Sequence, residues 1–425
     1  GLAFKRGERA GVAPVLAVAA LLATALFMFI APKWDPTLMT AGVYRPSHAM
    51  KVSAFAGGAP DAVRRATLND RVLYYREGIN TSVILGTDPI GKELWLRVGG
   101  KVDASTSDME TQVLLGLLPA ALADSGARAL VIGHGSGVTT ASVLAGGSGP
   151  TEVVELEPGV IDASRWFHAK GEDPLDDPRT TLIMGDARTH LLHSAGRYGL
   201  IVSEPSNPWM AGVEMLYSAE FLAAARDRLT PGGVYVQWYH QYETDRAAVE
   251  LVLRTVGSVF ERAAIWYGGG PDFLVLGMRE GVRPGDLARF AARAARPDLA
   301  AGLARSGVAE LPALLAHELL NPEQFRAVLT PGPLHTLTHP RLSDLAARAF
   351  FRGADLSPDG SRVVSGAIDG KVKIWDAPSG ALVKIVETES YPTNAAAFSP
   401  DGRRIVTGGE DGAAKVWDAL SAPLL

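Results

Sequence analysis

No cysteine occurs among the 425 residues of this chain, and charged residues are few, at 20%. The absence of cysteine excludes disulfide bonds, zinc–thiolate sites and thiol catalysis. A formal net charge of −5 provides no basic surface, so we expect no nucleic-acid partner. The histidines are scattered. His190 and His193 lie on one predicted helix without an accompanying acid or third histidine, so we expect surface residues and no metal. We expect His317, His335 and His339 at the surface or at helix caps.

Residues 12–31 are twenty apolar or small residues without a charge. At about 1.5 Å of rise per residue, a helix of this length crosses the hydrocarbon core of a bilayer. A signal peptide and a buried helix of a globular domain are the alternatives, but we expect a transmembrane helix. The chain starts with Gly1 instead of Met, so we interpret it as a fragment or a processed product, in which this helix is the last of several.

The segment 129–157 has the order strand, glycine turn, helix, strand, acid. This order is typical of the nucleoside-binding half of an α/β fold. Glycine allows a tight turn and a close approach of the backbone to a ligand. The glycines of the turn are Gly133, Gly135 and Gly137. Glu155 and Glu157 end the second strand, where a carboxylate can accept hydrogen bonds from both ribose hydroxyls.

Strands and helices alternate from here to about residue 280, which predicts a mostly parallel, doubly wound sheet. Two more predicted strands end in acids, at Asp186 and at Glu204. Ligands of such sheets lie beyond the carboxyl ends of the strands, so the three acids Glu155, Asp186 and Glu204 predict one binding site. For Glu204 and Asn207 the alternative is a proline-bounded turn that only closes the strand.

The composition changes along the chain and suggests five parts. We expect a transmembrane helix at 12–31, an antiparallel β domain at 70–108, a Rossmann-like domain at 109–280, a helical extension at 281–353 and repeats at 354–425.

The segments 357–376 and 399–418 are identical at 12 of 20 positions, with a period of 42 residues. They resemble the WD-repeat family, whose four-stranded blades form propellers. Two blades cannot close a ring, so further repeats are missing, other copies supply them, or this end is poorly ordered. We expect an interaction module for a protein partner.

Residues 72–280 resemble the spermidine synthase (aminopropyltransferase) family, and especially bacterial membrane proteins in which a synthase-like domain follows transmembrane helices. The matching segments are GKVDASTSD, VIGHGSGVT, VELEPGVIDASRWF, DDPRTTLIMGDARTHL, EPSNPWMAGVEMLYSAEF and LTPGGVYVQW. The resemblance implies an α/β fold class: a small N-terminal antiparallel β domain and a methyltransferase-like Rossmann domain. The transmembrane helix and a partial β-propeller complete the expected architecture.

The resemblance also implies roles for single residues. The glycine turn would shape the nucleoside pocket, with Ser136 at the position of a family acid. Glu155 would hold the ribose hydroxyls. Asp186 would accept a hydrogen bond from the adenine amino group, with Ala187 beside it. The co-substrate would be decarboxylated S-adenosylmethionine or S-adenosylmethionine itself.

The acceptor side departs from the family pattern. Glu204 and Asn207 occupy the positions of two family aspartates that attract and deprotonate the amine. Asp103 replaces a glutamine, and Gln112 replaces a tyrosine. Asp108 matches a family acid, although a helix N-cap is the alternative role for it. We therefore expect the adenosyl pocket to be retained, with an acceptor that differs from putrescine or with turnover lost.

Three functions follow from these observations. The first is transfer of an aminopropyl or related alkyl group to a small amine, in polyamine biosynthesis. The second is a methyltransferase that uses S-adenosylmethionine. The third is a non-catalytic nucleoside-binding membrane scaffold with a WD-repeat interaction module. We expect a membrane location with a cytoplasmic catalytic domain, because adenosyl co-substrates are supplied there, and a homodimer is one assembly left open.

Overall fold

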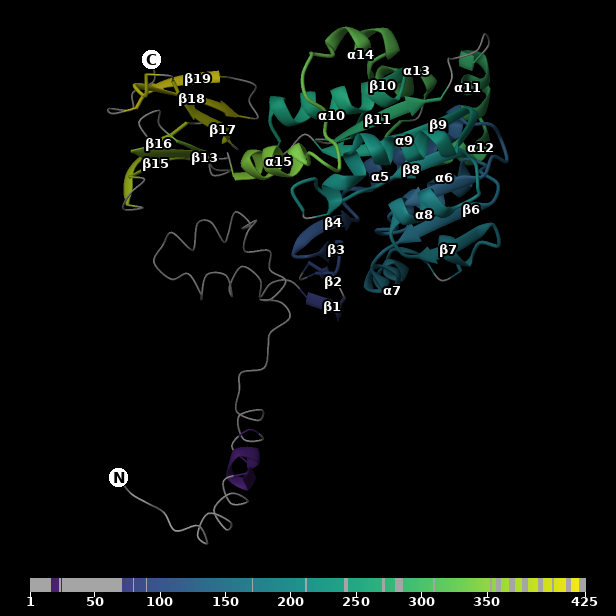
Figure 1. Ribbon diagram of the computed structural model, residues 1–425, viewed down its shortest axis with the longest axis horizontal. Coiled ribbons are helices and arrows are strands. Elements are labelled where there is room, and N and C mark those ends of the chain that lie inside the picture. The colour runs from purple at the N-terminus through teal and green to yellow at the C-terminus, as the bar shows by residue number, and fades with distance from the viewer. Residues whose placement is uncertain are drawn as a thin grey trace.

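A computed structural model describes most of the chain from residue 71 onward and little before it (Figure 1). The described residues are 17–22, 24, 71–78, 80–88, 90–169, 171–210, 212–240, 244–269, 272–279, 286–308, 310–351, 354–356, 361–366, 371–376, 381–388, 393–399, 401–409 and 414–419.

The prediction of a transmembrane helix is wrong. Among the described residues, no helix has the length and apolar character needed to cross a membrane. Within the apolar run 12–31, residues 17–22 and 24 are helical, and the others lie outside the described residues. This finding corrects the membrane component of the predicted fold class and the predicted membrane location.

A small antiparallel sheet precedes the main one, with its strands in the order β1-β2-β3-β4. The strands are β1 (Arg71–Glu77), β2 (Ser82–Thr87), β3 (Leu94–Val98) and β4 (Lys101–Ser105). One face buries Val83, Leu85 and Leu96 against Val160 and Ala163 of helix α7 (Pro158–Ser164). Helix α7 follows the acidic strand end, so this packing holds the small sheet beside the predicted site.

The main sheet has eight strands in the order β12-β10-β11-β9-β8-β5-β6-β7. The strands are β5 (Ala129–Ile132), β6 (Thr151–Glu155), β7 (Thr180–Met184), β8 (Tyr198–Ser203), β9 (Leu229–His240), β10 (Arg262–Gly269), β11 (Asp272–Met278) and β12 (Glu318–Leu320). The five strands β9-β8-β5-β6-β7 are parallel, and β10, β11 and β12 add antiparallel pairs. The chain runs outward from β5 through β6 to β7 and then returns to β8 on the other side of β5. The strand order therefore reverses between β5 and β8, where open α/β sheets bind their ligands.

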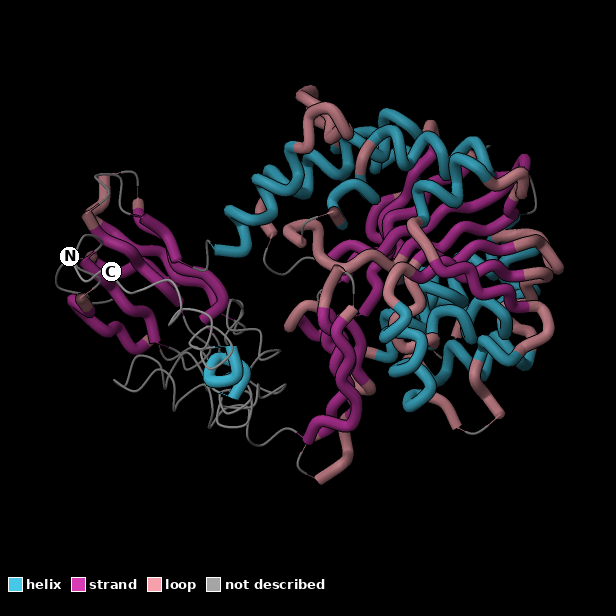
Figure 2. Tube along the Cα trace, turned by 60° about the horizontal axis from the view of Figure 1, so that its bottom comes forward, coloured by secondary structure: helices cyan, strands magenta, loops and turns pink. Residues whose placement is uncertain are grey.

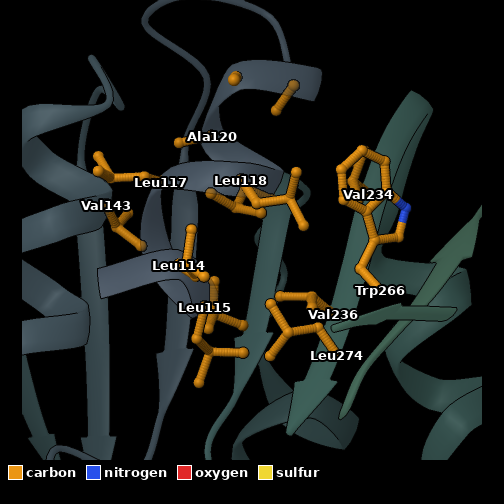
Figure 3. Packing of buried hydrophobic residues seen from close by; sticks show 14 of the residues in the cluster. Leu114, Leu115, Leu117, Leu118, Ala120, Val143, Val234, Val236, Trp266 and Leu274 are labelled. Carbon is orange, nitrogen blue, oxygen red and sulfur yellow. The ribbon is translucent and has the colours of Figure 1, made fainter. Parts of the chain in front are cut away.

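Helices cover both faces of this sheet, as the alternation along β5 requires. Ala129 and Val131 belong to one buried cluster, and Leu130 and Ile132 belong to the other, because successive strand residues point to opposite faces. On the first face lies helix α5, which is buried along almost its whole length (Figure 3). The helices of the main domain and extension are α5 (Met109–Leu122), α6 (Val138–Ala145), α8 (Ala187–His193), α9 (Ala219–Arg228), α10 (Arg246–Val259), α11 (Asp286–Ala294), α12 (Pro297–Arg305), α13 (Leu311–Ala316), α14 (Pro322–Val328) and α15 (Arg341–Phe351), with short 3₁₀ turns at Arg165–Phe167, Pro174–Asp176 and Val213–Tyr217.

The C-terminal strands form two further antiparallel sheets, which lie beyond α15 and apart from the main sheet (Figures 1 and 2). The first contains β13 (Ala354–Leu356), β14 (Arg362–Gly366), β15 (Lys371–Asp376) and β16 (Leu382–Glu387). The second contains β17 (Thr393–Phe398), β18 (Arg404–Gly409) and β19 (Ala414–Asp418). Val364, Ile374 and Ile405 are among the residues of their shared apolar core.

Two histidines are less exposed than surface residues, and one of them, His335, bonds to the start of a helix, which is the capping role expected as an alternative. His335 is 1% exposed, and its ring contacts the Glu214 carbonyl and accepts the Leu342 amide at the start of α15. It thus joins the extension to the main domain. The His190 ring lies 2.9 Å from a Glu152 carboxylate oxygen. Both side chains have structural partners.

A glycine in the core of the main sheet provides a test of the fold. A Cβ on Gly277 would lie 2.5 Å from the Phe260 ring, which stacks on Tyr235 at a centroid distance of 5.4 Å. We expect Gly277→Ala to lower the free energy of unfolding by about 1–3 kcal/mol, because the packed ring must shift. Urea denaturation measures the change. Gly408→Ala is the control, because nothing lies within 4 Å of the position that a Cβ would take there, and an equal loss in both variants would contradict the packing argument.

Candidate active site

A cavity of about 650 Å³ lies along the carboxyl ends of the parallel strands. The strand-end loops form one side of it, and the small N-terminal sheet forms another. Seven predicted site residues line it: Asp103, Gly133, Gly135, Glu155, Asp186, Ala187 and Glu204. Four others do not: Asp108, Ser136, Gly137 and Asn207. The three strand-end acids therefore share one cavity.

The glycine turn after β5 is shaped by close backbone packing against the end of β8. Gly133 has φ of 84°, and a Cβ there would lie 2.7 Å from the Glu204 carbonyl oxygen. The Glu204 amide in turn donates to the Ile132 carbonyl at 2.9 Å. A side chain at residue 133 would separate the two loops. Glycine at this position therefore brings Glu204 against the turn.

Glu155 is anchored by backbone donors. Its carboxylate accepts hydrogen bonds from the amides of His134, Leu156 and Glu157, at 2.8–2.9 Å. Burial raises the pKa of Glu155, and these three amides oppose the shift. A carboxylate has about four acceptor positions, so one remains for a ligand hydroxyl.

Glu157 is a second acid on this wall. It lines the cavity, and only 4% of its surface is exposed. Its Oε1 accepts the Asn80 amide from the small sheet at 3.1 Å, while Oε2 is buried with no hydrogen-bond partner among the described residues. The sequence places Glu157 at a strand end, but its burial depends on the small sheet.

Asp186 and Ala187 begin α8 at the end of β7. One Asp186 oxygen caps this helix by accepting the amide and hydroxyl of Thr189, at 2.7 and 2.6 Å. Asp186 is exposed and Ala187 is buried. The capping bonds fix the orientation of the Asp186 carboxylate at the rim of the cavity.

Glu204 lies at the reversal of strand order, between the glycine turn and the small sheet. Burial raises the pKa of Glu204 to about 8, and the nearby carboxyls of Asp108, Asp103 and Glu155 add to the shift. Its Oε2 is buried and has no partner among the described residues. Glu204 therefore holds a proton at neutral pH, and a cation in the cavity would favour the release of that proton.

Asn207 is fully buried behind this loop. Its amide nitrogen lies 3.2 Å from Nε2 of His240, and its Oδ1 has no partner among the described residues. Asn207 does not line the cavity, so it contributes to the shape of the loop around Glu204.

Asp103 and Asp108 belong to a buried polar cluster at the other end of the cavity. Asp103 accepts hydrogen bonds from Lys101 at 2.6 Å and from Ser206 at 2.7 Å. Asp108 stands at the N-cap position of α5 but makes no capping hydrogen bond with its side chain. Burial raises the pKa of Asp108 to about 6 and that of Asp272 to about 7.

Ser136 and Gly137 support the turn from behind. The Ser136 hydroxyl donates to the Gln112 side chain and accepts the Val138 amide at 3.2 Å. Gly137 has φ of 84°, and a Cβ there would lie 2.6 Å from Nε2 of His168. Packing accounts for both residues without a ligand.

Comparison with known proteins identifies this region. The family profile of the spermine/spermidine synthase domain matches residues 110–278, and that of the WD domain, G-beta repeat, matches residues 333–376 and 382–418. The chain carries a spermine/spermidine synthase domain followed by WD repeats. This agrees with the resemblance found in the sequence.

The similar proteins include several polyamine aminopropyltransferases. That of Korarchaeum cryptofilum is 26% identical over 147 residues, which cover 34% of this chain and 46% of the relative. That of Thermococcus kodakarensis is 32% identical over 116 residues, covering 26% and 40%. Putrescine N-methyltransferase 1 of Nicotiana tabacum is 31% identical over 122 residues, covering 27% and 32%. The chain spans less than half the length of these relatives.

Solved structures of similar proteins include a spermidine synthase in complex with the transition state analogue AdoDATO. It has a TM-score of 0.46 and 18% identity, and the match covers 62% of this chain and 86% of that one. The spermidine synthase of Thermotoga maritima has a TM-score of 0.46 and 17% identity, covering 65% and 88%.

Sequence reasoning missed several residues of the synthase domain that surround the cavity. Trp209, Met210 and Trp238 line it, and Lys101 and Asp272 lie behind Asp103. The segments EPSNPWMAG and LTPGGVYVQW contain the first three, so their proximity to a strand end was a usable signal. Lys101 and Asp272 offered none, because their burial follows from tertiary contacts.

The protonation of Glu204 predicts a pH dependence of stability. The folded state holds a proton that the unfolded chain releases near the ordinary pKa of 4.5, so stability falls as pH rises from there to about 8. We expect Glu204→Gln to remove this slope, which is at most about 1.4 kcal/mol per pH unit. Urea denaturation between about pH 5 and pH 8 measures it. The exposed Glu172→Gln is the control, and equal slopes in wild type and Glu204→Gln would contradict the assignment.

Proposed function

We propose that the synthase domain transfers an aminopropyl group from decarboxylated S-adenosylmethionine to a small amine, as a step of polyamine biosynthesis. The observation that carries the proposal is the convergence of Glu155, Asp186 and Glu204 on one cavity at the reversal of strand order. The relatives named polyamine aminopropyltransferase support it. We propose a protein partner for the WD repeats.

In this proposal the donor occupies the part of the cavity between β5 and β7. Glu155 accepts a hydrogen bond from a ribose hydroxyl at its remaining acceptor position, and three backbone amides hold its carboxylate in place. Asp186 accepts from the adenine amino group, next to the buried Ala187. The glycine turn lets the backbone approach the nucleoside. No metal is needed in this reaction, since the sulfonium is already an activated leaving group.

Glu204 is proposed as the base. The amine nitrogen attacks the methylene carbon bound to the sulfonium, the new C–N bond forms, and the C–S pair passes to sulfur to give a neutral thioether. An alkylamine has a pKa near 10, so it arrives protonated and must lose a proton to react. Glu204 accepts that proton in its carboxylate form, which the positive charge of the donor and of the acceptor favours.

A methyltransferase using S-adenosylmethionine is the second candidate. The similarity to putrescine N-methyltransferase favours it. The same cavity would then also hold the donor carboxylate. A binding protein without turnover is the third outcome, because Asn207 cannot accept a proton.

A panel of donors and amines tests these functions. We expect 5′-methylthioadenosine to bind in calorimetry, and product to form from decarboxylated S-adenosylmethionine and an amine. Product that forms from an amine with S-adenosylmethionine, but not with the decarboxylated donor, would favour the methyltransferase. Nucleoside binding without product from any donor would favour the binding protein.

Two substitutions separate binding from chemistry. We expect Glu155→Gln to weaken nucleoside binding by roughly tenfold, since it loses charged hydrogen bonds.

We expect Glu204→Gln to lower kcat by about 10²–10⁴ while nucleoside affinity is retained. In wild type kcat/KM should rise with pH toward about 8, following release of the Glu204 proton, and Glu204→Gln should lose this limb. Full activity of Glu204→Gln would refute its role as the base, and Glu172→Gln serves as the control.

A further inference from the structure

Lys101 is the first residue of β4, and its side chain is buried at the acceptor end of the cavity. It is 1% exposed. Its ammonium lies 2.6 Å from Oδ1 of Asp103 and 5.5 Å from the centroid of the Trp238 ring. A buried ammonium is stable only when it is paired. Asp103 and Trp238 both line the cavity, so Lys101 stands directly behind its wall.

Three carboxyl groups share this single ammonium. Besides its bond to Asp103, Lys101 interacts electrostatically with Asp108 and Asp272. Asp272 is 3% exposed and accepts a hydrogen bond from the Thr111 hydroxyl at 3.1 Å. Burial raises the pKa of Asp272 to about 7, so this group is partly protonated at neutral pH. The cluster therefore carries much less negative charge than its three acids suggest.

The strand order places this cluster on the acceptor side of Glu204. Glu204 follows β8, Trp238 lies on the neighbouring strand β9, and Asp272 begins β11 on the far side of β9. Glu155 and Asp186 lie in the opposite direction, on β6 and β7. At about 4.8 Å between strands, the two directions are well separated. Asp103 lines the same cavity and lies near Glu204, so an amine that reacts beside Glu204 has room to extend its remaining atoms toward Asp103.

The walls at this end are mostly apolar. Leu96, Trp209, Met210 and Trp238 line the same cavity as Asp103. Oδ1 of Asp103 already accepts hydrogen bonds from Lys101 and from the Ser206 hydroxyl. A second ammonium on the acceptor would therefore meet a carboxylate whose charge Lys101 neutralises.

We propose that Lys101 determines acceptor specificity, because its buried ammonium neutralises the Asp103 carboxylate that would otherwise attract the distal ammonium of a diamine, and the cavity then selects a primary monoamine with an apolar body. The inference rests on the proposed function and adds the class of acceptor to it. The Lys101 ammonium takes the place beside Asp103 that the distal ammonium of a diamine would otherwise take.

Butylamine and 1,4-diaminobutane test the inference, because they differ only in the second amino group. We expect wild type to prefer butylamine in kcat/KM by roughly tenfold or more, and Lys101→Met to shift the ratio toward the diamine by a similar factor. Lys101→Arg retains the charge and should keep the wild-type preference. Lys92→Met, which removes an exposed lysine from the connection between β2 and β3, is the matched control.

Calorimetry separates this inference from the proposed function. Binding of 5′-methylthioadenosine is measured first, and binding of each amine to the nucleoside complex follows, so turnover is not required. If the nucleoside does not bind, both the proposed function and this inference are overturned. If the nucleoside binds and wild type prefers the diamine, or Lys101→Met leaves the ratio unchanged, the inference alone is overturned. Should Lys101→Met fail to fold, the wild-type ratio decides.

Discussion

The structure depends on the burial of carboxylates at one edge of a parallel sheet. A buried carboxylate is stable only when donors or cations replace its water, or when it takes up a proton. Glu155 and Glu204 lie in the same cavity, but their carboxyl groups are stabilised in different ways. Three backbone amides hold Glu155, whereas one oxygen of Glu204 has no partner among the described residues and burial raises the pKa of Glu204 to about 8. The first arrangement suits a fixed acceptor of hydrogen bonds, and the second suits a group that exchanges a proton.

The fold brings these acids together through its packing. Strand β5 is buried on both faces, so its position is fixed by the two clusters that Val131 and Leu130 join. The neighbouring strands β6 and β8 pair with β5 in parallel register, which aligns their carboxyl ends. Gly133 then lets the loop after β5 pack against the loop that carries Glu204. The site is therefore a consequence of strand order and of one position where a side chain does not fit.

Local sequence patterns were sufficient for the features that depend on neighbouring residues. Short stretches of consecutive residues determine the strand ends, the glycine turn and the repeated WD segments. Acids at the ends of parallel strands must also meet at one edge of the sheet. Features that combine distant strands were not predictable in this way. Lys101, Asp272 and His240 come from β4, β11 and β9, and nothing in their local sequence marks them as buried. Asp108 follows the N-cap pattern but makes no capping bond, because it lies within a polar cluster. Hydropathy alone predicted the transmembrane helix, and no helix among the described residues has the length and apolar character for a span.

The departures from the family pattern on the acceptor side have a common electrostatic effect. Asn207 replaces a carboxylate with a neutral amide, and that amide is turned toward His240 behind the loop. Lys101 adds a positive charge next to Asp103 and near Asp272. Asn207 lowers the negative potential available to a second ammonium, and Lys101 offsets the charge that Asp103 adds in place of a family glutamine. The donor-side acids Glu155 and Asp186 keep their own partners, in the glycine turn and on α8. Glu204 is the ionisable carboxylate beside the reacting centre, and the positive charge of the donor favours its ionised form. The charge balance of the cavity therefore favours an acceptor that brings a single ammonium.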